Sequence, residues 1–153
     1  SAFRVSSIVW TVAQRDSRDT YMRLCMKATL KKSERLSSKK VIGSLFDKGS
    51  ENTKSVFLYP FRVSYFLQEL PNENTEPALP QMLISVSKRY FKHAVDRNLV
   101  KRRTREAYRL NKSILLQKKD NPLPASIAFV YIGKKIEDFA KIEKSMKSIL
   151  HKM

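Results

Sequence analysis

The side chains of this sequence that could do chemistry are concentrated in one basic stretch. Between positions 88 and 112 stand ten lysine or arginine residues and two acids, Asp96 and Glu106. Guanidinium groups can fork onto phosphate oxygens, and ammonium groups attract them as point charges. Because like charges repel, a stretch of this density predicts a polyanionic partner that neutralises it.

Residues suited to catalysis are sparse by comparison. His93 and His151 are the only histidines and lie far apart in sequence, and Cys25 is the only cysteine. Phosphodiester cleavage by a protein alone usually needs clustered carboxylates that hold a metal ion, or a paired general acid and base. The acids here are scattered, so the sequence predicts neither a catalytic residue nor a metal site on the protein. Asp96 is expected to cap a helix.

The composition of the whole chain agrees with a nucleic-acid partner. Its 153 residues contain 31 lysines and arginines against 14 acids, a formal charge of +17, and 42% of them are hydrophobic, enough for one domain with a buried core. An anionic membrane surface is the rival polyanion, but no apolar run approaches the roughly 20 residues that span a bilayer. The single cysteine excludes a disulfide framework and favours a reducing, cytoplasmic setting.

The elements that must position the basic stretch follow from the apolar pattern. Apolar side chains at every second position predict a half-buried strand over 55–70, interrupted or edged at Pro60. Further strands are predicted at 82–87 and 126–133, after a proline-rich loop at 71–80. Helices are predicted from Ser37 or Ser38 to Gly49, over 96–111 and over about 135–151.

The predicted order is therefore α-β-β-α-β-α, with a possible split of the long first strand. A sheet with helices packed on it places the chain in the α+β class, as a compact two-layer α-β sandwich. Residues 35–153 form the predicted RNA-binding domain. Residues 1–34 lack a sustained period and are predicted to be a flexible or partly helical arm.

The predicted helix 96–111 separates an apolar side from a basic side. Val100, Thr104, Ala107 and Tyr108 fall together and face the core. On the adjoining side, successive i,i+4 pairs of like charge each cost roughly 0.2–0.5 kcal/mol, so an ordinary solvated face is a poor explanation and a phosphate-tracking surface a better one. Asn98 could contact a base, a sugar or water, although an Asn near a helix start is more often a cap. The residues predicted to lie on this adjoining side are Arg97, Asn98, Lys101, Arg102, Arg105 and Arg109.

The amino-acid sequence of this region resembles a known family signature. The segment SVSKRYFKHAVDRNLVKRRTREAYR (85–109) is similar to that of the bacterial ribonuclease P protein subunit, in which Ser-x-(Lys/Arg)-(Lys/Arg) is followed by Ala-Val-x-Arg-Asn-x-x-Lys-Arg-x-x-Arg-(Glu/Gln). So many fixed spacings make the match specific. A weaker likeness extends over about 35–152, and residues 1–30 fall outside it.

The resemblance implies a function that composition could not give. In that family a large RNA cleaves precursor tRNA, using RNA-bound Mg²⁺ to activate water, and the protein binds both this RNA and the 5′ leader of the precursor. The enzyme is thus a ribonucleoprotein endoribonuclease with catalysis in its RNA, and we expect a monomer in the holoenzyme. The implied fold has a left-handed crossover between the last two strands, formed by the basic helix, where the common hand is right-handed.

The resemblance also implies residue roles. The positions that match the family's RNA-contacting helix, with the basic residues around them, are Lys88, Arg89, Arg97, Asn98, Lys101, Arg102, Arg105 and Arg109. The implied leader-binding cleft lies between the sheet and the first helix, with Ile42, Phe46 and either Phe57 or Tyr59 in it. Ile42 stands where the family often has a phenylalanine, so stacking there is lost. Tyr90 and Phe91, in place of a usual glycine turn, could flank RNA.

One alternative function remains open at this level. A ribosomal-type or RNA-chaperone protein could use the same charged helix on structured RNA.

Overall fold

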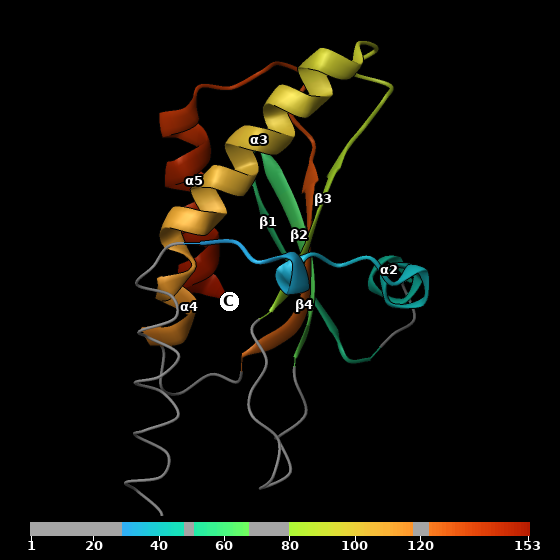
Figure 1. Ribbon diagram of the computed structural model, residues 1–153, viewed down its shortest axis with the longest axis vertical. Coiled ribbons are helices and arrows are strands. Elements are labelled where there is room, and N and C mark those ends of the chain that lie inside the picture. The colour runs from blue at the N-terminus through green and yellow to red at the C-terminus, as the bar shows by residue number, and fades with distance from the viewer. Residues whose placement is uncertain (1–28, 48–50, 68–79, 118–122) are drawn as a thin grey trace, which may run out of the picture.

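The chain folds as a four-stranded sheet with helices on both faces (Figure 1). The structure, a computed structural model, describes residues 29–47, 51–67, 80–117 and 123–153. Its elements are η1 (Lys32–Glu34), α2 (Lys39–Phe46), β1 (Thr53–Leu58), β2 (Phe61–Leu67), β3 (Gln81–Val86), α3 (Ala94–Asn111), α4 (Ser113–Gln117), β4 (Pro124–Tyr131) and α5 (Phe139–Lys152).

The strand order is β1-β2-β4-β3. β1 pairs antiparallel with β2, β2 pairs antiparallel with β4, and β3 pairs parallel with β4. β2 and β4 are therefore the central strands, which explains why most of their side chains are buried on both faces. This is the predicted α+β class.

The two faces of the sheet are covered unequally. α3 and α5 lie together on one face, and α2 lies on the other (Figure 1). The main core is on the α3 and α5 side, where Phe61, Phe129, Tyr131 and Tyr108 meet edge to face or nearly so. The second cluster, beneath α2, is smaller and is centred on Leu45. A short helix thus covers only part of its face.

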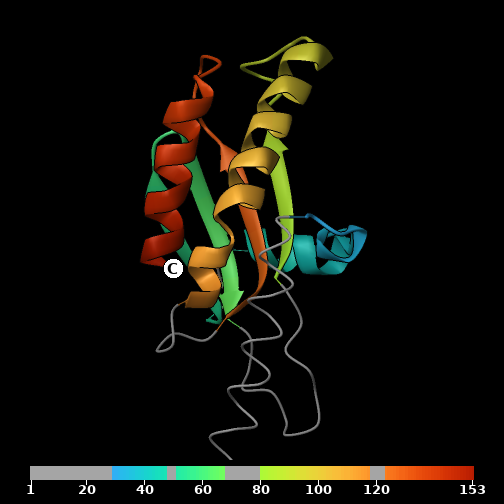
Figure 2. The ribbon, with the colours of Figure 1, turned by 60° about the vertical axis from the view of Figure 1, so that its left-hand side comes forward.

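The crossover from β3 through α3 to β4 is left-handed. In Figure 2, α3 and α5 lie in front of the sheet, and β4 lies to the left of the parallel strand β3 while both strands rise. Seen from the helix side, the common right-handed unit would put the second strand to the right. The hand that the resemblance implied is the one found.

Several predicted boundaries need correction. The strand expected over 55–70 is divided by a turn at Tyr59–Pro60, the split that the pattern allowed. The basic helix begins at Ala94, and His93 occupies the cap position without a side-chain hydrogen bond, so Asp96 lies in the first turn and is not the cap. The last helix begins at Phe139 and not near 135, and α4 was not predicted. Gly49, most of the 71–80 loop and residues 1–28 lie outside the described residues.

The packed part of the chain also begins earlier than predicted. Residues 29–34 were assigned to the arm, but Glu34 is only 2% exposed and reaches Lys112 at the end of α3. Arg35 forms an isolated parallel bridge to Met82 of the edge strand β3. Within the described ranges, no helix has the length and apolar character needed to cross a membrane.

Candidate nucleic-acid interface

The basic helix α3 is held by its apolar side. Val100, Thr104, Ala107 and Tyr108 are buried, as their spacing predicted, and the Thr104 hydroxyl donates to the Val100 carbonyl at 2.8 Å. α3 packs against α5 and β3. The buried side fixes the rotation of the helix and therefore which residues face outward.

Four of the predicted RNA-binding residues form an outward surface without acidic partners. Asn98 and Arg102 are exposed, and Lys101 and Arg105 are partly exposed. We call these four residues the basic side of α3. In the part of the chain that the structure describes, no acidic side chain forms an ion pair with any of its three cations. Lys88 and Arg89 are exposed in the turn before α3.

Two other predicted phosphate contacts have partners within the protein. Arg97 donates through Nη1 to the carbonyl oxygens of Phe91 (2.8 Å) and Lys92 (2.7 Å). Arg109 forms an ion pair with Glu106, one turn away on the same helix, with Nε donating to Oε2 at 2.9 Å. This hydrogen bond lowers the pKa of the Glu106 carboxyl. Both side chains thus have partners within the protein, and their predicted contacts with RNA stay predictions.

The cation at the C-terminal end of α3, Lys112, is neutralised by a carboxylate of the protein itself. Lys112 is 4% exposed, and its Nζ donates to both carboxylate oxygens of Glu34, at 3.1 and 3.0 Å, and to the carbonyl of Thr29. A buried ammonium with both a counter-ion and a carbonyl acceptor is a satisfied structural group. Lys112 is therefore not available to RNA.

On the other face of the sheet, which carries α2, aromatic side chains remain exposed. Phe57 is 67% exposed and Phe46 is 47% exposed. The register places Phe57 opposite Arg62, Arg62 opposite Val130, and Val130 opposite Ser85, so these residues form one row across the sheet. The sequence did not predict Arg62 in this row. The pairing of Arg62 with Phe57 across the β1–β2 hairpin could have predicted its place in this row.

The structure separates Tyr59 from this row. Its hydroxyl donates to Glu137 Oε1 at 2.9 Å, and Lys141 Nζ lies 5.4 Å from its ring centroid. Ser145 donates to the Tyr59 carbonyl at 2.9 Å, so the β1–β2 turn is tied to α5. The hydrogen bond to Glu137 raises the pKa of Tyr59. Of the two residues whose register was ambiguous, Phe57 is the one on the α2 face.

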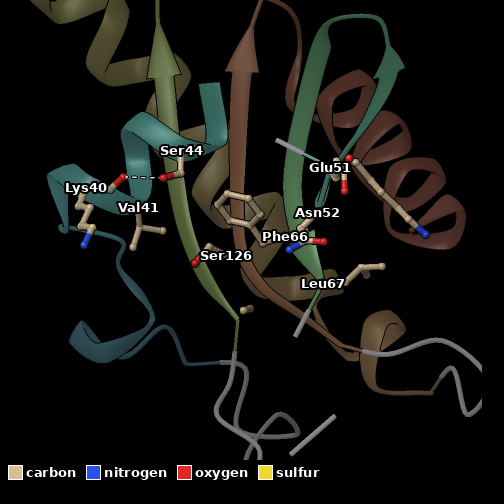
Figure 3. A pocket seen from close by; sticks show the side chains of 10 residues that line it. Lys40, Val41, Ser44, Glu51, Asn52, Phe66, Leu67 and Ser126 are labelled. Atoms are coloured by element: carbon tan, nitrogen blue, oxygen red, sulfur yellow. Dashed lines mark hydrogen bonds between the residues drawn. The ribbon is translucent and has the colours of Figure 1, made fainter. Parts of the chain in front are cut away.

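A hollow lies on the side of α2 away from Ile42 and Phe46. Lys40, Val41 and Ser44 line it from the helix, and Phe66 and Ser126 line it from the sheet (Figure 3). On a helix, positions 42 and 46 lie opposite positions 40 and 44. α2 therefore separates the hollow from the part of the same sheet face that lies on the Ile42 and Phe46 side. Ile42 itself is half-buried against the small core.

The two aromatic residues that were predicted to flank RNA, Tyr90 and Phe91, also differ in their exposure. Tyr90 is exposed, whereas Phe91 is buried with its ring centroid 5.9 Å from that of Tyr131. Phe91 therefore supports the fold and cannot flank RNA. Across the described residues, there is no group of three or more His, Cys, Asp or Glu side chains placed to hold a metal ion.

Comparisons with known proteins identify the family of this chain. The family described as Ribonuclease P matches residues 30–153. The chain is 40% identical over 124 residues to the "Ribonuclease P protein component" of Porphyromonas gingivalis, covering 79% of this chain and 83% of that protein. It is 30% identical over 131 residues to the protein of the same name from Chlorobium phaeobacteroides, covering 80% and 86%. The chain therefore belongs to the ribonuclease P protein family, the protein subunits of a ribonucleoprotein endoribonuclease that processes tRNA.

Proposed function

We propose that this chain binds the RNA of ribonuclease P through the basic side of α3 and the 5′ leader of precursor tRNA through the α2 face of the sheet. One observation carries the first half of the proposal. Lys101, Arg102 and Arg105 stand on one side of a helix whose opposite side is buried, and no acid of the described residues pairs with them. Phosphates are the partner that such a surface fits, because each neutralised phosphate releases condensed counterions.

The leader half of the proposal is supported by exposed residues on the α2 face of the sheet. Phe57 and Phe46 offer exposed rings, and the exposed Arg62 adds a cation next to Phe57. Proteins that bind single-stranded nucleic acid combine aromatic platforms with positive charge. Ile42 supplies apolar contact at its edge, and Tyr59 has no part in it because its hydroxyl is bonded to Glu137.

Catalysis in this proposal belongs to the RNA. The described residues contain no group of three or more His, Cys, Asp or Glu side chains placed to hold a metal ion, so no step is assigned to a metal on the protein. Following the family resemblance, Mg²⁺ is held mainly by the RNA. The protein acts as a monomer in a cytoplasmic holoenzyme and contributes binding and orientation of the precursor.

The test is cleavage of precursor tRNA by a bacterial ribonuclease P RNA at low Mg²⁺, with and without the chain. We expect the chain to increase turnover of leader-bearing precursor. An unchanged turnover, together with binding to unrelated structured RNAs, would favour the ribosomal-type or chaperone alternative, which the family membership does not favour.

A variant separates leader binding from folding. Phe46→Ala, at an exposed ring, should weaken binding of precursor tRNA more than binding of mature tRNA, which lacks the leader. Equal losses for the two RNAs would show that α2 had lost its structure, not a leader contact.

A further inference from the structure

The turn between β3 and α3, residues 87–93, carries an exposed ring that the interface described above does not use. Tyr90 is 43% exposed, and the cations Lys88, Arg89 and Lys92 around it are exposed as well. No acidic residue occurs between positions 81 and 95. An exposed aromatic ring among cations fits an unpaired nucleotide, whose base can stack while its phosphates meet the charges.

The backbone on both sides of Tyr90 is fixed. On one side, the amide of Arg89 donates to Ser87 Oγ at 3.2 Å. On the other side, Phe91 is 6% exposed, its amide donates to the Ser87 carbonyl at 3.3 Å, and its own carbonyl accepts from Arg97. A turn anchored in this way loses little conformational freedom when it binds.

Arg97 is the link between this turn and the basic side of α3. Its Nη1 donates to two successive carbonyls, at 2.8 and 2.7 Å, which ties the residues following Tyr90 to the first turn of the helix. A lysine at this position would keep the charge, but its side chain is one bond shorter than the path to Nη1, so its ammonium group would fall short of the position from which Nη1 donates to both oxygens. The geometry therefore gives Arg97 a task other than phosphate binding.

We propose that Tyr90 is a base-stacking residue for an unpaired base of the ribonuclease P RNA, with Lys88, Arg89 and Lys92 on the adjoining phosphates and Arg97 as the positioning residue. This inference rests on the proposed function, since it needs RNA on the basic side of α3. The RNA subunit is the occupant because the turn runs directly into α3, whereas Phe46 and Phe57 lie on the α2 face.

The first test measures the affinity of the full chain for a bacterial ribonuclease P RNA over a range of salt concentrations. Tyr90→Ala should weaken binding about 5- to 150-fold, as expected for one stacked base, with an unchanged salt slope because no charge is removed. Tyr90→Phe should restore the affinity and Tyr90→Leu should not, since leucine is apolar but has no ring. Wild-type affinity in Tyr90→Ala, or full rescue by leucine, would overturn the stacking assignment.

The second test concerns the positioning role of Arg97. Arg97→Lys should weaken RNA binding and speed amide hydrogen exchange of residues 88–93 in the free protein. Combined with Tyr90→Ala, it should add less than its separate effect, because the ring that it positions is already gone. A lysine variant with full affinity and unchanged exchange would show that Arg97 holds nothing that binding needs.

Two comparisons keep this inference separate from the proposed function. If the wild-type chain does not bind ribonuclease P RNA, both fail. If it binds, and loss of Lys101, Arg102 and Arg105 lowers the salt slope while Tyr90→Ala has no effect, only the Tyr90 assignment fails. A defect of Tyr90→Ala that is confined to leader-bearing precursor would move the contact to the leader and overturn the assignment to the RNA subunit.

Discussion

The helices α3 and α5 pack side by side and are both rich in basic residues, but their charges are arranged differently. On α5, Lys147 pairs with Glu143 at 3.5 Å, and Lys141 pairs with Glu137, just before the helix, at 3.0 Å, both at i,i+4 spacing. Opposite charges at this spacing stabilise a helix by roughly 0.2–0.5 kcal/mol each. α5 therefore has the ordinary charge pattern of a helix that faces water.

On α3 the same spacing is occupied by like charges. Arg97, Lys101 and Arg105 follow one another at i,i+4, and such pairs are unfavourable by similar amounts. Arg97 is drawn toward the turn before the helix, and Lys101 and Arg105 remain without an acidic partner among the described residues. The difference teaches that total charge alone does not distinguish α3 from α5, whereas the lack of compensating acids among the described residues does.

The largest effect on RNA binding is expected from removing three cations from α3, compared with removing three from α5. Replacing Lys101, Arg102 and Arg105 with alanine should weaken binding to ribonuclease P RNA and lower the salt slope by about two to three units, since each phosphate contact contributes about 0.7 to 0.9 units. The matched triple variant of α5, with Lys141, Lys144 and Lys147 changed to alanine, removes the same charge. Filter binding at several salt concentrations measures both. Equal slopes in the two variants would erase the distinction between the helices.

The next largest effect concerns Lys112, a buried cation at the end of α3 that is neutralised by Glu34. Glu34→Gln leaves the Lys112 ammonium buried without a counter-ion, which should lower the free energy of unfolding by about 3–5 kcal/mol. Urea unfolding measures it, with Glu51→Gln as an exposed control. A loss no greater than that of the control would mean that Lys112 reaches solvent, and it would then belong with the outward cations of α3.

A smaller effect is expected on the α2 face, where Phe57 and Tyr59 can be compared directly. Phe57→Ala should weaken binding of leader-bearing precursor by about 1–3 kcal/mol, the contribution of one stacked base, with little change in stability because the ring is exposed. Tyr59→Ala should leave leader discrimination intact, because this ring is bound to Glu137. The ratio of precursor to mature-tRNA affinity measures both variants. A larger loss of discrimination in Tyr59→Ala would reverse their roles.

The smallest effect is expected from titrating the paired charges at α5. Hydrogen bonds from Lys141 and Tyr59 lower the pKa of Glu137 below its usual value of 4.5. A carboxyl whose pKa is lowered by folding stabilises the folded state above its unfolded pKa, and this contribution is lost as the pH falls through the folded pKa. The difference in Tm between wild type and Glu137→Gln should therefore narrow from pH 7 to pH 3. A constant difference would show that the charge of Glu137 contributes nothing.

Local periodicity was enough to predict the parts of this fold that depend on neighbouring residues. The buried positions of α3, from Val100 to Tyr108, follow directly from the 3.6-residue repeat, and the burial on both faces of β4 follows from its continuous apolar run. Both signals come from residues a few positions apart. The left-handed crossover came only from the family resemblance, because elementary rules favour the other hand.

The contacts that the sequence did not predict all depend on partners distant in sequence or on the shape of a turn. Glu34 bonds to Lys112 and Tyr59 to Glu137, each across 78 residues, and no periodicity reports such a pair. Arg97 has carbonyl partners only because the preceding turn brings Phe91 and Lys92 over the helix start. The roles of the RNA-binding residues stay predictions until RNA-binding measurements test them.

The exposed rings of Phe46 and Phe57 have a consequence for the free subunit. Two exposed aromatic side chains on one face of the sheet favour apolar association between copies of the protein. A formal charge of +17 on 153 residues opposes such an encounter, since the copies repel one another before the rings can touch. Salt shortens the range of this repulsion to about 3 Å at 1 M, so concentrated salt should allow copies of the free subunit to associate.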